Sequence, residues 1–180
     1  MRLADLVTIM SETLVGRWIA VQVRPKAEKM VSELLLHKGY ETLLPLHNRS
    51  LHNRRHAVSE AVFPGYVFCH VGEHSSGLIV TTPGVLRLVG VAGKPEPIPA
   101  AEMQNIARIV ETGLPLHPWL EFEAGDPVEV TDGPLRGCRG VIRTVRNEQC
   151  LVVSVNLLQR SVAVEVSRGW VVSAATASGR

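Results

Sequence analysis

Basic residues gather without any acid in the segment His47–His56, and their side chains suit contact with nucleic acid. The segment contains three histidines and three arginines, Arg49, Arg54 and Arg55. Guanidinium groups match the geometry of phosphate oxygens, and Asn or His side chains can reach base edges. Three arginines release only a few counterions on binding, and the segment alone would therefore bind nucleic acid weakly. The alternative is a solvated hairpin tip, and we favour the nucleic-acid contact over it.

Aromatic residues alternate along the apolar stretch Phe63–His70. With a period of two, one face of a strand carries Phe63, Val67 and Cys69. The opposite face carries Tyr66, Phe68 and His70. The first face is the expected core. The second is a candidate docking surface, because an apolar patch that stays exposed usually marks a protein partner. Alternatively, a helix of the same domain covers both rings, and the residue pattern leaves the two readings open.

No arrangement typical of catalysis is present. The chain lacks the Gly-x-Ser-x-Gly, glycine-rich phosphate-loop and His-Glu-x-x-His patterns. The histidines of the basic segment have no flanking thiols and no helical spacing, so loop histidines are favoured over metal ligands. Cys69, Cys138 and Cys150 form no Cys-x-x-Cys pair, which argues against zinc and disulfides and favours a reducing cytoplasm. We therefore expect a protein that acts by binding, without enzyme activity, metal or cofactor.

Size and charge limit the architecture and the partners. The chain has 180 residues, which suits one or two small domains, and 46% of them are hydrophobic, enough for packed cores. A formal net charge of +2 is too small to indicate a general nucleic-acid binder, so any basic surface must be local. No run reaches the ~18 apolar residues of a membrane span. We expect no signal peptide, no membrane partner and a loosely held arm at residues 1–16.

Hydrophobic periodicity predicts a mixture of strands and helices up to residue 112. Strands are expected at 18–23, 41–46, 61–71 and 85–91, with helices over 26–38, within 73–82 and over 100–111. The first strand is apolar on both faces, which is typical of a central strand. This order indicates an α+β sandwich, with helices against a mainly antiparallel sheet.

The pattern changes after residue 112. Residues 113–121 contain Gly113, Pro115 and Pro118 without clear periodicity, which is typical of a linker. Short strands follow at 128–131, 140–145, 151–155, 162–166 and 170–172, and such a series indicates a small β-barrel. We predict domains at 17–112 and 122–173, separated by the linker and followed by a tail at 174–180.

Glycines and a proline give the second domain a recognisable motif. In Gly125–Ile142, a strand leads into the turn Asp132-Gly133-Pro134, and Gly137 and Gly140 precede the next strand. Glycine tolerates positive φ and proline cannot donate to a strand ladder, so this order suits a tightly curved barrel. The stretch resembles the KOW motif, which ribosomal proteins and the NusG family of transcription elongation factors share. A plain barrel turn without any ligand is the alternative for an isolated motif.

The first domain also resembles the NusG family. The matching features are Trp18, Glu28-Lys29, Phe63–Phe68, Thr82–Val85, Pro97–Pro99 and Glu102. Together with the KOW motif they cover about residues 17–173 in the family's order. The resemblance implies an NGN-like α/β sandwich that binds RNA polymerase, followed by a five-stranded SH3-like KOW barrel that recruits further partners.

The resemblance also assigns roles to residues. Contact with the coiled coil of the polymerase clamp falls to Tyr66, Phe68 and Leu88, and the basic segment would lie near upstream or non-template DNA. Ser75 and Ser76 would lie near the opposing lobe, with a plain helix cap as the alternative. The KOW turn and partner surface would comprise Gly133, Pro134, Leu135, Gly140, Leu158 and Arg160.

One departure points to a branch of the family. General NusG proteins usually carry Ile-Phe-Gly-Arg where this chain has Leu157–Arg160, and the run Leu157–Val166 is similar to UpxY-like specialised antiterminators. The resemblance still implies Rho or a small-subunit ribosomal protein as partners of the KOW domain, but this departure argues against both. We favour a monomeric, specialised factor that suppresses pausing or termination. The alternative is a ribosome-associated or RNA-binding KOW protein.

Overall fold

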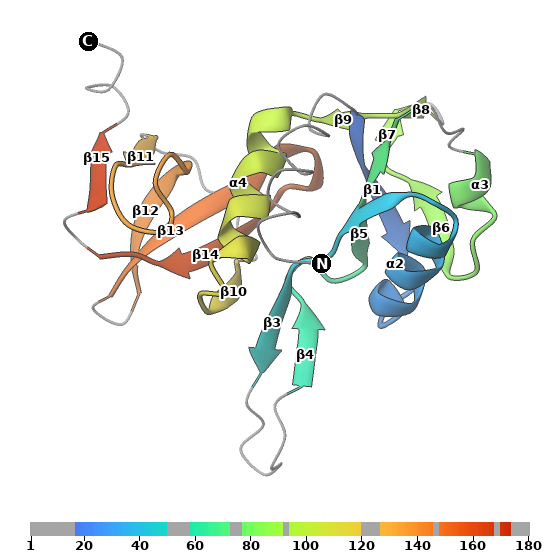
Figure 1. Ribbon diagram of the computed structural model, residues 1–180, viewed down its shortest axis with the longest axis horizontal. Helices are drawn as coiled ribbons and strands as arrows, with labels where there is room; N and C mark the ends of the chain where they lie inside the picture. The colour runs from blue at the N-terminus through green and yellow to red at the C-terminus, as the bar shows by residue number, and fades with distance from the viewer. Residues whose placement is uncertain are drawn as a thin grey trace. The chain divides into compact units, whose positions relative to one another are not determined.

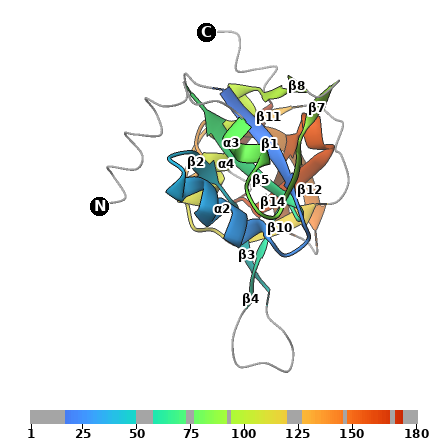
Figure 2. The same cartoon turned by 90° about the vertical axis from the view of Figure 1, so that its right-hand side faces the viewer.

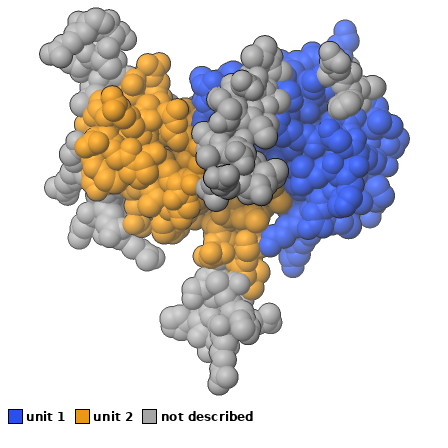
Figure 3. Space-filling model, viewed as in Figure 1, with its two compact units in different colours: residues 1–43, 65–104 blue, residues 44–64, 105–180 orange. Residues whose placement is uncertain are grey.

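The computed structural model describes residues 17–49, 58–72, 77–91, 94–119, 127–145, 148–167 and 170–173. The chain forms two compact units (Figure 3): unit 1 holds residues 1–43 and 65–104, and unit 2 holds residues 44–64 and 105–180. The boundary between residues 104 and 105 lies inside a helix and not in the expected linker. Residues 44–64, which include the basic segment, belong to unit 2. The domain boundaries at 17–112 and 122–173 stay a prediction. The expected arm and tail lie outside the described residues.

Unit 1 is built on an antiparallel sheet (Figure 1). Its strand order is β2 (Glu41–Leu43), β5 (Tyr66–Val71), β1 (Arg17–Val23) and β6 (Val85–Leu88), and β9 (Pro97–Ile98) also pairs with β1. The strand β1 is central and almost entirely buried, as its run of apolar residues predicts. Gly65, at a φ of +82°, makes the turn that leads into β5.

Helix α2 (Glu28–His37) covers one face of this sheet. Its Ser32 Oγ lies 2.8 Å from Thr42 Oγ1 of β2, and Thr42 pairs with Cys69. The helix therefore lies over the face that carries Cys69, Val67 and Val21. It ends before Gly39, which has a φ of +86° at the position where the sequence predicts a helix stop.

The remaining elements up to residue 111 are short, apart from one helix. They are α3 (Gly77–Val80), the pair β7 (Gly90–Val91) and β8 (Lys94–Pro95), and α4 (Ala100–Glu111). The limits of α4 agree with the predicted helix at 100–111. None of the described helices is long and apolar enough to cross a membrane.

Unit 2 combines a hairpin with a larger sheet. Strands β3 (Leu46–Arg49) and β4 (Val58–Ala61) form the hairpin, which extends away from the rest of its unit in both views (Figures 1 and 2). The sheet has the order β10 (Leu116–Trp119), β14 (Arg160–Glu165), β13 (Glu148–Val155), β12 (Arg139–Val145), β11 (Val128–Val130) and β15 (Val171–Ser173). A short 3-10 helix, η1 (Asn156–Leu158), connects β13 to β14.

This sheet differs in two ways from the sequence prediction. Within the segment expected to be a linker, β10 pairs with β14, and its Trp119 packs against Cys150, Val152 and Ala163. Pro118 is tolerated because β10 is the end strand, whose outer edge needs no hydrogen-bond donor. The described pairings run from β10 to β15 without joining these two ends. A closed five-stranded barrel is therefore not found among the described residues.

Candidate interaction surfaces

Three side chains form a row across the sheet of unit 1. Gln22 of β1 pairs with Tyr66 of β5 on one side and with Arg87 of β6 on the other. Directly paired residues of antiparallel strands point to the same face, so the three lie side by side. Arg87 is exposed, whereas Tyr66 and Gln22 are half-buried. The Arg87 Nε donates a hydrogen bond to Gln22 Oε1 over 2.7 Å, which orients the guanidinium.

Farther along the same face, the side chains are buried. Phe68 is 0% exposed, and its neighbours Ala20 and His70 are also buried. The structure therefore does not show two exposed rings: Phe68 is buried, and so is every residue of β5 after Tyr66, on both faces of the strand. Tyr66 keeps part of its surface because it begins the strand. Contact of Tyr66 and Phe68 with a polymerase clamp stays a prediction.

Leu88 lies on the opposite face of the sheet from Tyr66. It pairs with Val21, one residue before the Gln22–Arg87 pair, so its side chain shares the face that α2 covers. The family resemblance groups Leu88 with the two rings, but the register of β6 against β1 puts it on the other face of the sheet. Leu88 is half-buried, and any partner contact it makes comes from the α2 side.

A buried polar cluster lies on the face of Phe68. The rings of Trp18 and His70 are 5.3 Å apart and tilted by 58°, and His70 Nδ1 is 3.9 Å from Glu41 Oε2. Among the described residues, Trp18 Nε1 and His70 Nε2 have no hydrogen-bond partner. Burial raises the pKa of the Glu41 carboxyl, and His70 opposes that shift. On the α2 side, burial and the nearby Glu41 charge raise the pKa of the Cys69 thiol to about 12.

Four of the five residues predicted to contact nucleic acid or the opposing lobe lie outside the described part of the chain. Arg54, Arg55, Ser75 and Ser76 lie outside the described residues. The backbone of Arg49 ends β3 and pairs with Val58. The predicted contacts of the three arginines and two serines stay predictions.

The turn Asp132-Gly133-Pro134, predicted as a KOW turn, is packed around its glycine. Gly133 has a φ of +75°, and a Cβ at this position would lie 2.8 Å from the Trp170 ring, so only glycine fits. Pro134 is exposed, whereas Leu135 is 0% exposed. Leu135 therefore belongs to the core of the turn. Its place in the predicted turn and partner surface is thus in the interior of the turn.

The other residues of the predicted KOW surface have different environments. Gly140 pairs with Val128, and a Cβ there would collide with the carbonyl oxygen of Val152, so this glycine permits close strand packing. Leu158 in η1 is buried. Arg160 is half-exposed and begins β14. Among the side chains longer than glycine in this set, Pro134 is exposed and Arg160 is half-buried, whereas Leu135 and Leu158 are buried.

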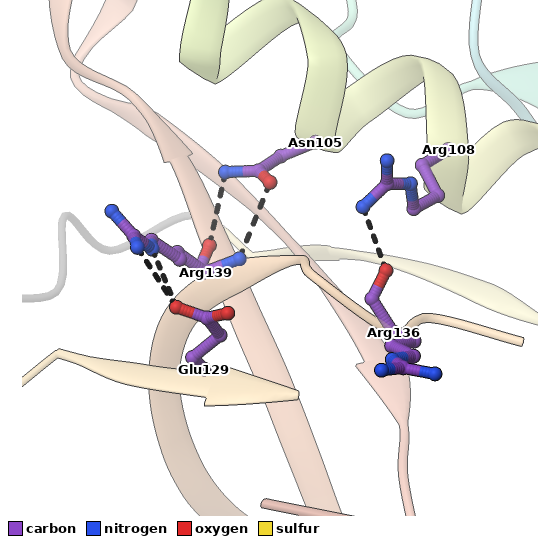
Figure 4. A network of polar contacts seen from close by, with 5 residues as sticks. All are labelled: Asn105, Arg108, Glu129, Arg136 and Arg139. Carbon is purple, nitrogen blue, oxygen red and sulfur yellow. Dashed lines mark hydrogen bonds and ion pairs between the residues drawn. The ribbon is translucent and has the colours of Figure 1, made fainter. Parts of the chain in front are cut away.

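A polar network joins the second half of α4 to β12 and to the turn before it (Figure 4). The Asn105 side chain makes two hydrogen bonds with the backbone of Arg139: its Nδ2 donates to the carbonyl over 3.1 Å, and its Oδ1 accepts from the N–H over 3.2 Å. Arg108 Nη1 donates to the Arg136 carbonyl over 2.7 Å. The Arg139 guanidinium binds Glu129 Oε2 through Nε and Nη2, both at 2.9 Å.

No sequence pattern indicated this network or the Arg87–Gln22 contact. Apolar spacing predicts which residues of α4 are buried, but the partner of a polar helix residue depends on tertiary packing. Burial raises the pKa of the Cys138 thiol, and Arg108 opposes that shift, which agrees with a position between the turn and the helix.

Comparison with known proteins gives a consistent result. The family described as "Transcription termination factor nusG" matches residues 16–107. A transcription termination/antitermination protein NusG of Neisseria meningitidis is 32% identical over 166 residues, which are 83% of this chain and 93% of the relative. The protein of the same description from Vibrio cholerae is 30% identical over 178 residues, covering 90% and 98% of the two chains.

A solved structure supports the same fold. It is described as "Domain interaction in Thermotoga maritima NusG", and it matches with a TM-score of 0.57 and 23% identity over 90% of this chain and 99% of the other. The matched family segment spans the sheet with Tyr66, Gln22 and Arg87. By its sequence, over nearly the full length of two relatives, the chain belongs to the NusG family.

Proposed function

We propose that the chain is a transcription elongation and antitermination factor that binds RNA polymerase through its N-terminal half. The observation that carries this proposal is the family match over residues 16–107, which includes the sheet and both of its faces. The relatives from N. meningitidis and V. cholerae are described as transcription termination/antitermination proteins. The factor would act by binding alone, as the absence of catalytic motifs in the sequence suggests.

The mechanism is a shift between two states of the polymerase. Contact of Tyr66 and its neighbours with the clamp, and of Ser75 and Ser76 with the opposing lobe, would bridge the two sides of the nucleic-acid channel. Such a bridge favours the closed state over the open, paused state only by the difference in its affinity for the two. A tenfold difference in affinity corresponds to about 1.4 kcal/mol. Arg49, Arg54 and Arg55 would add contacts to upstream or non-template DNA.

The C-terminal half would recruit further partners to the complex. Its accessible residues Pro134 and Arg160 are candidates for that contact. The sequence at Leu157–Arg160 supports a specialised, UpxY-like factor over the general one. Binding to Rho and to a small-subunit ribosomal protein should therefore be compared between this chain and a general NusG protein.

Affinity purification of the tagged full chain, with and without nuclease treatment, tests the proposal. We expect polymerase subunits to co-purify in both conditions, and purified chain to shorten pauses in transcription with the cognate polymerase. Recovery of ribosomal RNA or ribosomal proteins without polymerase would instead support the ribosome-associated or RNA-binding alternative. A chain with Arg49, Arg54 and Arg55 all replaced by Ala should still bind core polymerase and should lose DNA crosslinking in the elongation complex.

A further inference from the structure

We infer that Arg87, at the exposed end of the Tyr66–Gln22–Arg87 row, recognises a carboxylate of an acidic polymerase segment that docks on this row. This inference rests on the proposed function, because the expected partner is the polymerase. It adds a specificity-determining residue that the sequence motifs did not indicate.

The row is exposed to solvent, whereas the rest of the same sheet face is buried. Tyr66, Gln22 and Arg87 keep exposed surface, whereas Trp18, Phe68 and other residues of the same face are buried. The three residues come from three adjacent strands and are held in register by the sheet. A partner would therefore meet a fixed arrangement of an aromatic ring, an amide and a guanidinium. Tyr and Arg are the residue types that most often dominate the energy of protein interfaces.

Arg87 is oriented for a planar anion. Its Nε is occupied by Gln22 Oε1 at 2.7 Å, and this is the contact that the structure gives the guanidinium among the described residues. The two terminal nitrogens are thus presented from a fixed plane. Two parallel N–H donors match the two oxygens of a carboxylate, and such bonds are shorter and stronger than neutral ones.

The surroundings at this end of the sheet are cationic. Arg24 and Lys26 are exposed in the turn after β1, and the backbone N–H of Arg24 bonds to the carbonyl of Gly84, just before β6. Glu28, an acidic residue at the same end, is buried and accepts a hydrogen bond from the Gly65 N–H over 2.7 Å. The charge of this surface therefore complements an acidic partner, and such complementarity increases the rate and specificity of docking.

A protein partner fits these features better than nucleic acid does. A stacking platform for bases needs an aromatic ring with an open face, and Tyr66 is half-buried. Phosphate contacts could still form at Arg87, so the experiment must separate the two ligands.

The test measures binding of the full chain to purified core RNA polymerase, at several salt concentrations and without nucleic acid. Arg87→Gln removes the charge, and Arg87→Lys keeps the charge but not the planar fork. Gln22→Glu places a carboxylate beside Arg87 and so occupies it within the chain. Arg17→Gln is the matched control, because Arg17 is an exposed arginine at the far end of β1, paired with Val71.

We expect Arg87→Gln and Gln22→Glu to weaken binding about tenfold or more, which corresponds to 1.4 kcal/mol, with Arg87→Lys in between. Arg17→Gln should bind like the wild type, and the melting temperatures of all variants should match. If the wild type binds core polymerase and Arg87→Gln binds equally well, the inference is wrong and the proposed function stands. If Arg87→Gln loses affinity only when a DNA–RNA scaffold is present, the ligand is phosphate and the inference is also wrong. Failure of the wild type itself to bind would overturn the proposed function.

Discussion

Replacing Phe68 by alanine should destabilise the fold, and this prediction tests the architecture of the N-terminal sheet. Phe68 is fully buried on a strand that has neighbours on both sides. Truncating a buried Phe to Ala costs about 3–5 kcal/mol, from lost transfer energy and the remaining cavity. For a chain of this size, each kcal/mol lowers the melting temperature by about 2–4 °C. The expected fall is therefore roughly 6–20 °C.

Two further variants make the test specific. Phe68→Leu nearly conserves the apolar volume and should cost less than about 1.5 kcal/mol. Tyr66→Ala, on the same face but half-buried, should lower the melting temperature much less than Phe68→Ala does. Calorimetry or circular dichroism on the full chain gives all three values. If Phe68→Ala melted with the wild type and lost only polymerase binding, the ring would be an exposed contact and the reasoning from burial would be refuted.

Three more predictions follow from described contacts. Asn105→Ala removes two hydrogen bonds to β12, each worth about 0.5–1.5 kcal/mol, and should lower stability in urea titrations, whereas Gln104→Ala, an exposed amide on the same helix, should not. Gly133→Ala forces a side chain into positive φ and against Trp170, and it should cost at least about 1–2 kcal/mol in the same titration; an unchanged midpoint would contradict the turn geometry. The raised pKa of Cys69 means that the folded protein favours the neutral thiol. The contribution of this thiol to the free energy of unfolding is complete below about pH 9 and is lost as pH rises towards 12. Cys69→Ala should therefore lose less stability between these two pH values than the wild type does in the same titration.

Regular elements with a clear period could be predicted from the sequence. The helix at 100–111 was confirmed to the residue, because its apolar positions recur at helical spacing between a proline-rich entry and Gly113. The predicted strand at 61–71 is confirmed only over 66–71, because Gly65 makes a turn within the predicted range. In each case a few neighbouring residues are enough to predict the element.

Features that depend on distant pairing could not be predicted. The strand β10 has only four residues, and one of them is Pro118. Nothing in its own sequence therefore distinguishes it from a linker. Its pairing with β14 becomes visible only in the folded sheet. The same holds for Leu88, whose face depends on its register with β1, and for Asn105, whose partner lies 34 residues away.

The position of β10 also bears on how the C-terminal half should be produced for experiments. In the full chain, β10 occupies the outer edge of β14, and Trp119 shields the apolar side chains of Cys150, Val152 and Ala163. A fragment that begins at residue 122 would leave that edge with unpaired backbone donors and acceptors, next to a newly uncovered apolar surface. Unprotected edges of this kind pair with other chains and promote aggregation. A fragment that begins before Leu116 keeps the edge covered and should remain monodisperse at concentrations where the shorter fragment precipitates.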